Sequence, residues 1–240
     1  MGGAQSHFGS TDWDQADGGV KDATQTFDGA KPTESHALFT LIKNKSPVNQ
    51  RDYIMSNEDD DMLYTTAAIQ GTTKDFDLMT GGTTATKLFH IHTDPSDHAK
   101  WIIYSYKATF EGQTPATNTQ NIKVEEPLFA KAVVTIAWDK YHGVISLYEA
   151  APDNSTTEGT VSNDHLIRIE EIKSITPQFQ SFLPAMGLLH PKLCGYWVRE
   201  YTPKTDRTKM HLAKGTDIAL HCILAVITNL LRLERQADSS

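Results

Sequence analysis

The stretch TDIALHCILAVITNLLRLER, residues 216–235, decides the fold of this chain. Thr216 is the predicted N-cap of a helix, and Asp217 is well placed against the positive end of the helix dipole. The residues that follow are apolar on nearly every face, and such a helix is stable only when it is buried all round. A membrane span needs about 20 mainly apolar residues. Three polar residues interrupt this run: His221, Thr228 and Asn229. We therefore expect the helix inside a protein and no transmembrane span.

Composition narrows the class of protein. The chain has 240 residues, of which 39% are hydrophobic and 22% are charged, as in an ordinary globular protein. Its net charge of −8 argues against broad binding to nucleic acid, which usually depends on a basic surface. The two cysteines, Cys194 and Cys222, give neither a metal spacing nor a disulfide framework. The start of the chain lacks the apolar segment of a secretory signal, so we expect a reducing, cytoplasmic compartment.

The first 33 residues differ from the rest of the chain. They are rich in Gly, Ser, Thr, Asp and Gln, without an apolar period, and are expected to form a disordered tail. Met1–Ser6, MGGAQS, fits the N-myristoylation pattern, with Gly2 as the acylated residue. A single myristoyl chain holds a membrane only marginally, and no neighbouring cysteine supplies a second anchor. Residues 34–236 then form the folded domain.

The folded domain reads as about ten to twelve short strands separated by turns. No strand–helix–strand alternation is present, which excludes a parallel, doubly wound sheet. Residues Thr176–Leu189 look irregular, because two prolines interrupt them. The expected strands are Leu38–Lys43, Asp52–Met55, Met62–Ala68, Phe76–Met79, Leu88–His92, Trp101–Phe110, Phe129–Trp138, Val144–Tyr148, Leu166–Ile172, Gly195–Tyr201 and Thr208–Ala213. A closed barrel removes sheet edges and creates an interior. We therefore expect a mainly β fold: a closed antiparallel β-barrel that encloses the hydrophobic C-terminal helix.

The end of the chain and three early strands share a layout with one known superfamily. Residues 210–220, MHLAKGTDIAL, run from a strand through a Gly-Xaa-Asp step into an apolar helix. Leu38–Lys43, Leu63–Thr65 after an acidic turn, and Leu88–Ile91 stand in the order of that superfamily's early strands. In these features residues 36–235 resemble the tubby C-terminal-like superfamily, especially its LURP-one-related family.

This resemblance implies an antiparallel barrel of about twelve strands around a hydrophobic helix. Tubby proteins bind phosphoinositide headgroups at the plasma membrane, and scramblase-like members act on or near lipids. No biochemical activity is established for the LURP-one-related group, so the resemblance brings neither catalytic residues nor a cofactor. It implies a module that binds lipid or protein, in the cytoplasm or peripherally on the plasma membrane.

His90 and His92 provide the strongest alternative function. They stand at alternate positions of an expected strand and so share one face, and His98 could close on the same ion. Imidazole together with a carboxylate suits zinc or iron, and the pair resembles the histidine pair of a cupin-type barrel enzyme. However, the expected Glu is absent, with only Asp94 and Asp97 as stand-ins, and a cupin keeps its barrel interior for the metal. Ordinary strand histidines are the favoured interpretation, and a metal-dependent enzyme is the alternative.

The most basic cluster in the second half of the chain is Lys204, Arg207 and Lys209, at an expected hairpin turn. These residues are candidates for contact with anionic lipid headgroups, although a solvated hairpin tip is the simpler interpretation. The chain has neither a nucleophile elbow nor a phosphate-binding glycine loop before a helix. We therefore expect a non-enzymatic, tubby-like barrel that associates with a membrane or a partner protein, with Gly2 as the lipidation site.

Overall fold

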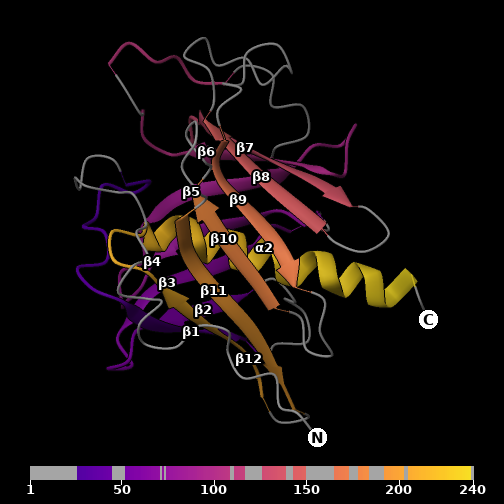
Figure 1. Ribbon diagram of the computed structural model, residues 1–240. Coiled ribbons are helices and arrows are strands. Elements are labelled where there is room, and N and C mark those ends of the chain that lie inside the picture. The colour runs from indigo at the N-terminus through magenta and orange to yellow at the C-terminus, as the bar shows by residue number, and fades with distance from the viewer. Residues whose placement is uncertain are drawn as a thin grey trace, which may run out of the picture.

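The computed structural model describes most of the chain from residue 26 onward. The described residues are 26–44, 52–70, 72, 74–108, 111–116, 126–138, 143–149, 165–172, 178–183, 192–202 and 205–238. Within them, twelve antiparallel strands form one sheet and a single helix follows it (Figure 1). The strands are β1 (Ala37–Lys43), β2 (Tyr53–Ser56), β3 (Met62–Ala68), β4 (Phe76–Thr80), β5 (Lys87–Thr93), β6 (Lys100–Ser105), β7 (Phe129–Trp138), β8 (Gly143–Glu149), β9 (His165–Ile172), β10 (Gln178–Leu183), β11 (Lys192–Tyr201) and β12 (Asp206–Leu212). The helix is α2 (Ile218–Asp238). The predicted mainly β fold with a C-terminal helix is therefore confirmed.

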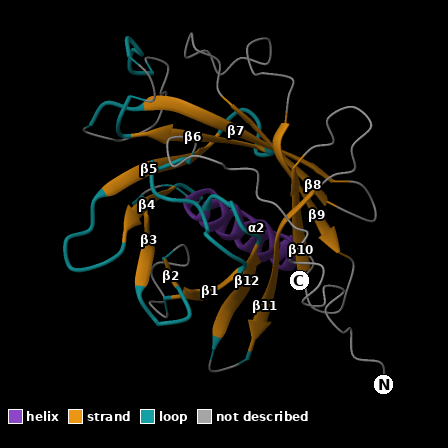
Figure 2. Cartoon of the chain, turned by 60° about the vertical axis from the view of Figure 1, so that its left-hand side comes forward, coloured by secondary structure: helices purple, strands orange, loops and turns teal. Residues whose placement is uncertain are grey.

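The order of the strands is that of a closed barrel. Consecutive strands pair antiparallel from β1 through to β12, and β1 also pairs with β12, so the first strand lies between the second and the last. Figure 2 shows the strands arranged around α2. With the first and last strands paired, neither carries the row of unpaired backbone groups that a free sheet edge presents.

The centre of the molecule is filled by the helix. Every residue of α2 from Ala219 to Leu231 is buried. These side chains form one core with inward-facing residues of the strands, among them Leu41, Phe76 and Trp197. The helix is apolar on nearly every face and is packed against the strands on every side, as expected from the sequence. In its described residues, α2 is not long and apolar enough to cross a membrane.

The start of the helix differs from the prediction. The Asp217 carboxylate accepts the Leu220 backbone N–H at 2.9 Å, so Asp217 is the N-cap. Thr216, the predicted cap, instead donates its hydroxyl to the Cys194 carbonyl at 3.2 Å. The helix therefore begins one residue later than predicted, and the Thr216 side chain connects the segment between β12 and α2 to β11.

Residues 26–33, which the sequence assigned to the disordered tail, pack on this end of the barrel. The Phe27 backbone N–H donates to the Asp217 carboxylate. Thr33 exchanges backbone hydrogen bonds with Gly215 and Thr216, and its hydroxyl donates to the carbonyl of Ala213. These contacts are single and non-periodic, so they leave no hydrophobic pattern in the sequence. The packed part of the chain therefore begins before the predicted boundary at residue 34.

Two strands also differ from the prediction. β10 occupies Gln178–Leu183, inside the stretch expected to be irregular. In the sequence, Pro177 directly precedes this strand and Pro184 directly follows it, so neither proline falls among the residues that pair. β6 is shorter than the expected strand 101–110 and ends at Ser105, whose hydroxyl accepts the Lys107 backbone N–H at 3.0 Å and turns the chain.

A second, smaller cluster lies on the outer face of β6 and the start of β7. On β6, Ile102 and Tyr104 pack with Leu128 and Ala130, apart from the core around the helix. The register of β5 with β6 sets His92 opposite Ile102 and His90 opposite Tyr104. Alternate residues of a strand point to opposite faces, and the residues on either side of His90 belong to the core around α2. Both histidines therefore lie on the outer face of the barrel wall.

Candidate functional site

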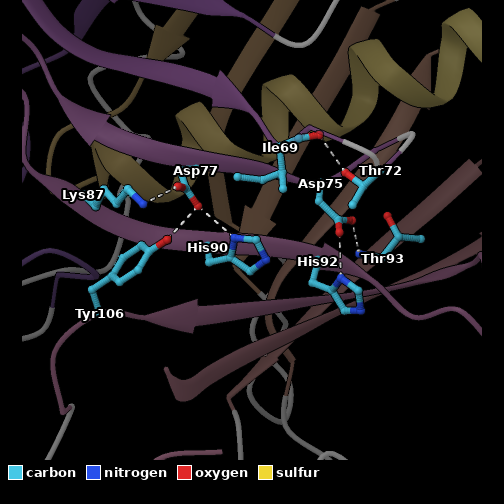
Figure 3. A network of polar contacts seen from close by, with 9 residues as sticks. All are labelled: Ile69, Thr72, Asp75, Asp77, Lys87, His90, His92, Thr93 and Tyr106. Atoms are coloured by element: carbon cyan, nitrogen blue, oxygen red, sulfur yellow. Dashed lines mark hydrogen bonds and ion pairs between the residues drawn. The ribbon is translucent and has the colours of Figure 1, made fainter. Parts of the chain in front are cut away.

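A buried polar network connects the two histidines of β5 with two aspartates of β4 and the turn before it (Figure 3). His90 Nδ1 lies 2.8 Å from Asp77 Oδ1, and His92 Nδ1 lies 2.8 Å from Asp75 Oδ2. All four side chains are buried, and His90 is only 1% exposed. The two imidazole rings stack at a centroid distance of 6.2 Å. Each histidine is thus oriented by its own carboxylate.

Asp77 is held as an anion by three neighbours. Burial by itself raises the pKa of this carboxyl. The hydrogen bond and charge interaction with His90, the hydrogen bond from Tyr106 and the charge of Lys87 outweigh that effect, so the pKa is lowered. The Tyr106 hydroxyl donates to Asp77 at 2.9 Å, and Lys87 Nζ lies 3.4 Å from the other carboxylate oxygen. Because a carboxylate only accepts hydrogen bonds, His90 donates through Nδ1. Its other ring nitrogen, Nε2, is turned away from Asp77 (Figure 3).

Asp75 stands at the end of the turn between β3 and β4. The backbone N–H of Ile69 donates to the Asp75 carbonyl at 3.1 Å, and the Thr72 hydroxyl donates to the Ile69 carbonyl at 3.1 Å. The Asp75 carboxylate accepts the Thr93 backbone N–H at 3.0 Å in addition to its contact with His92. This side chain therefore fastens the turn to the end of β5.

Among the described residues, one group of three ligand-bearing side chains is close enough to hold a metal ion. It consists of Asp75, His90 and His92, whose ligand atoms lie within 4.8 Å of one another. The sequence hypothesis chose the two histidines of this group correctly but proposed His98 as the third ligand. His98 is exposed in the turn between β5 and β6. The other stand-ins, Asp94 and Asp97, cap that same turn, because their carboxylates accept the backbone N–H groups of Ser96 and Ala99.

Asp75 was missed because the signal for it lies in strand pairing and not in local spacing. The β4–β5 hairpin pairs Asp77 with His90. Counting two residues back along β4 and two forward along β5 brings Asp75 beside His92 on the same face. The alternating pattern D-x-D before the turn and H-x-H after it is visible in the sequence at residues 75–77 and 90–92. It becomes a site only when the hairpin register is known.

The site also differs from a cupin-type centre in its position. A cupin directs its histidines into the barrel, whereas here His90 and His92 lie on the outer face and α2 occupies the interior. The sequence hypothesis combined a metal site with an enzyme centre in the barrel interior, and these histidines do not lie in that interior. In the part of the chain that the structure describes, the group of ligands lies outside the barrel interior.

The basic residues proposed for lipid contact are partly described. Arg207 and Lys209 lie on β12 and are 45% and 37% exposed. Both contact the same carboxylate, because Arg207 Nε and Lys209 Nζ lie 2.7 Å and 3.1 Å from oxygens of Glu200. Lys204 and the proposed lipidation site Gly2 lie outside the described residues. The pairing with Glu200 lowers the net positive charge of this hairpin, which the sequence hypothesis did not include.

Comparisons with protein-family models, with curated proteins and with solved structures find no match to this chain.

Proposed function

We propose that this chain is a non-enzymatic, tubby-like barrel module that associates with anionic membrane surfaces. In this proposal an acyl chain on Gly2 gives the first attachment, and the β11–β12 hairpin gives the second. The observation that carries it is the buried helix: α2 takes up the space in which other barrels hold a substrate. Because the helix fills the interior of the barrel, we expect ligands to bind on the outer surface. The layout also agrees with the one that the superfamily resemblance implies.

Exposed apolar and basic side chains near the β11–β12 hairpin support membrane contact. Tyr201 at the end of β11 is 68% exposed, and Ile42 on β1 is 45% exposed. Ile42 is the register partner of Arg207. A tyrosine ring and an aliphatic side chain enter the headgroup region favourably, and each basic residue near an anionic surface contributes about 1 kcal/mol.

The first experiment is flotation of the full-length protein with liposomes that contain phosphatidylserine and a phosphoinositide. The protein is prepared with and without co-expressed N-myristoyltransferase, beside a Gly2→Ala variant. We expect binding that needs both Gly2 and the acyl chain, because one chain is a weak but real anchor. Absence of binding in every preparation contradicts the proposal.

The second experiment examines the hairpin through Glu200→Gln. This change removes the carboxylate that both basic residues contact, and we expect binding to anionic liposomes to strengthen about fivefold, the equivalent of one charge. The effect should fade as salt shortens the Debye length. Glu170→Gln is the matched control, since Glu170 lies 3.0 Å from Arg168 in another exposed pair on β9. Equal strengthening by both variants would indicate a response to net charge alone.

A further inference from the structure

The network on β5 contains one buried ring nitrogen, His90 Nε2, that has no hydrogen-bond partner. Among the described side chains that are not exposed, four buried atoms lack a hydrogen-bond partner: His90 Nε2, Thr93 Oγ1, Trp101 Nε1 and Arg232 Nη1. The indole and guanidinium nitrogens are donors and cannot bind a cation. His90 Nε2 is different, because an imidazole whose Nδ1 donates to a carboxylate can present its Nε2 to a metal ion. A buried acceptor that finds no donor is unfavourable unless something occupies it.

The unpartnered nitrogen faces the other two ligands. In Figure 3 the His90 ring turns its Nε2 side toward His92 and Asp75. The ligand atoms of the three residues lie within 4.8 Å of one another. Ligands at 2.0–2.2 Å from a tetrahedral zinc ion are about 3.4 Å from each other. Small rotations of the side chains are therefore sufficient to bring all three onto one ion.

The surroundings of the ligands also match those of a metal centre. In metal sites, a ligating histidine commonly donates its other ring nitrogen to a carboxylate, which fixes the tautomer and raises the basicity of the ligand. Asp77 has this position behind His90, and it is itself fixed by Tyr106 and Lys87.

We propose that Asp75, His90 and His92 bind one divalent first-row transition-metal ion, of the zinc type, on the outer face of the barrel. Two imidazoles and one carboxylate suit zinc or iron, whereas magnesium and calcium prefer oxygen ligands throughout. The ion takes the place of the proton between Asp75 and His92. It ties the turn before β4 to the end of β5, and its fourth position is left for water or an exogenous ligand. This site is independent of the membrane contacts proposed above.

The test uses the full-length protein, freed of metal with a chelator and titrated with Zn²⁺ and Co²⁺. Calorimetry should give one ion per chain, and the visible spectrum of the Co²⁺ form should be that of a four-coordinate nitrogen and oxygen site. The melting temperature of the wild type should rise with Zn²⁺. Failure to bind either ion, or a six-coordinate cobalt spectrum unchanged from that of the free ion, overturns the proposal.

Variants locate the ion. His90→Gln should abolish binding and the rise in melting temperature, whereas His98→Gln, in the exposed turn, should retain both. Asp77→Asn should keep the ligands and weaken binding by about 10–100-fold. The exposed pair His36 and His211, with ring nitrogens 3.3 Å apart, is the competing location. Binding that survives His90→Gln and disappears in His211→Gln would assign the ion to that pair and overturn the proposal.

A measurement on the wild type avoids variants that fail to fold. Long-range ¹H–¹⁵N spectra of the histidine rings report which nitrogen carries the proton. Without metal, His90 should show protonated Nδ1 and bare Nε2, and Zn²⁺ should shift the Nε2 resonances of His90. A His90 ring already protonated at Nε2 before metal is added, or unchanged after it, contradicts the assignment.

Discussion

The three polar residues that interrupt the apolar helix and the polar network of β4 and β5 differ in how completely their buried groups are paired. On the inner face, the polar side chains that interrupt the apolar helix all have partners. His221 donates to the Asp217 carbonyl at 2.8 Å and accepts from the Ser181 hydroxyl at 2.9 Å. Asn229 donates to the Thr208 hydroxyl at 3.1 Å. On the outer face, the network of β4 and β5 is as deeply buried, yet His90 keeps one nitrogen without a partner.

The difference shows what each polar group is for. Each of the three helix residues has one partner on a surrounding strand, so these bonds help to fix the rotation of α2 inside the barrel. In the outer network the two carboxylates orient two imidazoles, and His90 Nε2 is left without a partner. Satisfied networks specify a structure, and an unsatisfied one calls for an explanation by function. Four predictions examine this comparison.

The largest effect is expected from the interior. Leu224 is fully buried in α2, and Leu224→Ala should lower the free energy of unfolding by about 2–5 kcal/mol, through lost burial and the cavity left behind. Ile42→Ala on the exposed surface of β1 is the control and should change it by less than about 0.5 kcal/mol. Urea denaturation measures both. Similar losses in the two variants would mean that α2 is not packed as a core element.

The second prediction concerns pH at the start of α2. Burial raises the pKa of Asp217 to about 6, with hydrogen bonds from Leu220 and Phe27 opposing it. Burial lowers the pKa of His221 to about 4. The folded state therefore binds a proton at Asp217 that the unfolded state has lost, and this contribution to stability is full below about pH 4 and gone above about pH 6. His221 acts oppositely, because its contribution is full above about pH 6.5 and lost toward pH 4.

Asp217 and His221 each change the free energy of unfolding by about 3 kcal/mol across this range, and their opposite pH dependences nearly cancel between pH 4 and 6. The wild type should consequently show a nearly flat stability in this range. Asp217→Asn removes one of the two, so its stability should fall as the pH is lowered from 6 to 4. Urea denaturation at several pH values measures the slope. A wild type and a variant with parallel pH profiles would show that Asp217 titrates normally.

A third, smaller effect concerns one bond of the inner network. The Thr228 hydroxyl accepts the Trp197 indole N–H at 3.2 Å and donates to the Ala225 carbonyl at 2.9 Å. Thr228→Val keeps the shape and leaves the indole unpaired, which should cost about 1–3 kcal/mol. Thermal unfolding measures it, with Thr228→Ser as the control that keeps the hydroxyl. An unchanged melting temperature in the valine variant would show that this inner bond is dispensable.

The smallest effect is expected on the outer face. Tyr106→Phe removes one hydrogen bond from Asp77, which keeps its contacts with His90 and Lys87. Stability should fall by about 0.5–1.5 kcal/mol, and zinc affinity should fall less than in Asp77→Asn. Denaturation and calorimetry on the same preparation measure the two. A loss of affinity as large as that of Asp77→Asn would place Tyr106 closer to the ion than the network suggests.

Much of the fold was predictable because the signals are local. Met62–Ala68 and Phe129–Trp138 were predicted with the bounds that the structure gives them, since alternation and turn residues mark both ends. β10 was missed because its flanking prolines looked like interruptions of one irregular stretch. Residues 26–33 were assigned to the tail because isolated hydrogen bonds, such as that of Phe27 with Asp217, have no sequence period.

In the candidate sites, too, the residues with a local sequence signal were predicted and those that depend on strand pairing were not. The pair His90 and His92 was visible from its spacing, because strand geometry puts alternate residues on one face. Asp75 was not, since it enters the group through its contact with His92, 17 residues later on the paired strand. The basic hairpin was visible as charge, but its pairing with Glu200 depends on the β11–β12 register.

The sequence by itself determined that the last segment is a helix buried on all sides, because no polar stripe is available to face water. It also determined that short antiparallel strands must surround it. Only the tertiary structure decided which face of the wall each strand residue meets, because a register shift of one residue exchanges the two faces. That decision put His90 and His92 outside the barrel, joined them to Asp75, and left the interior to the helix.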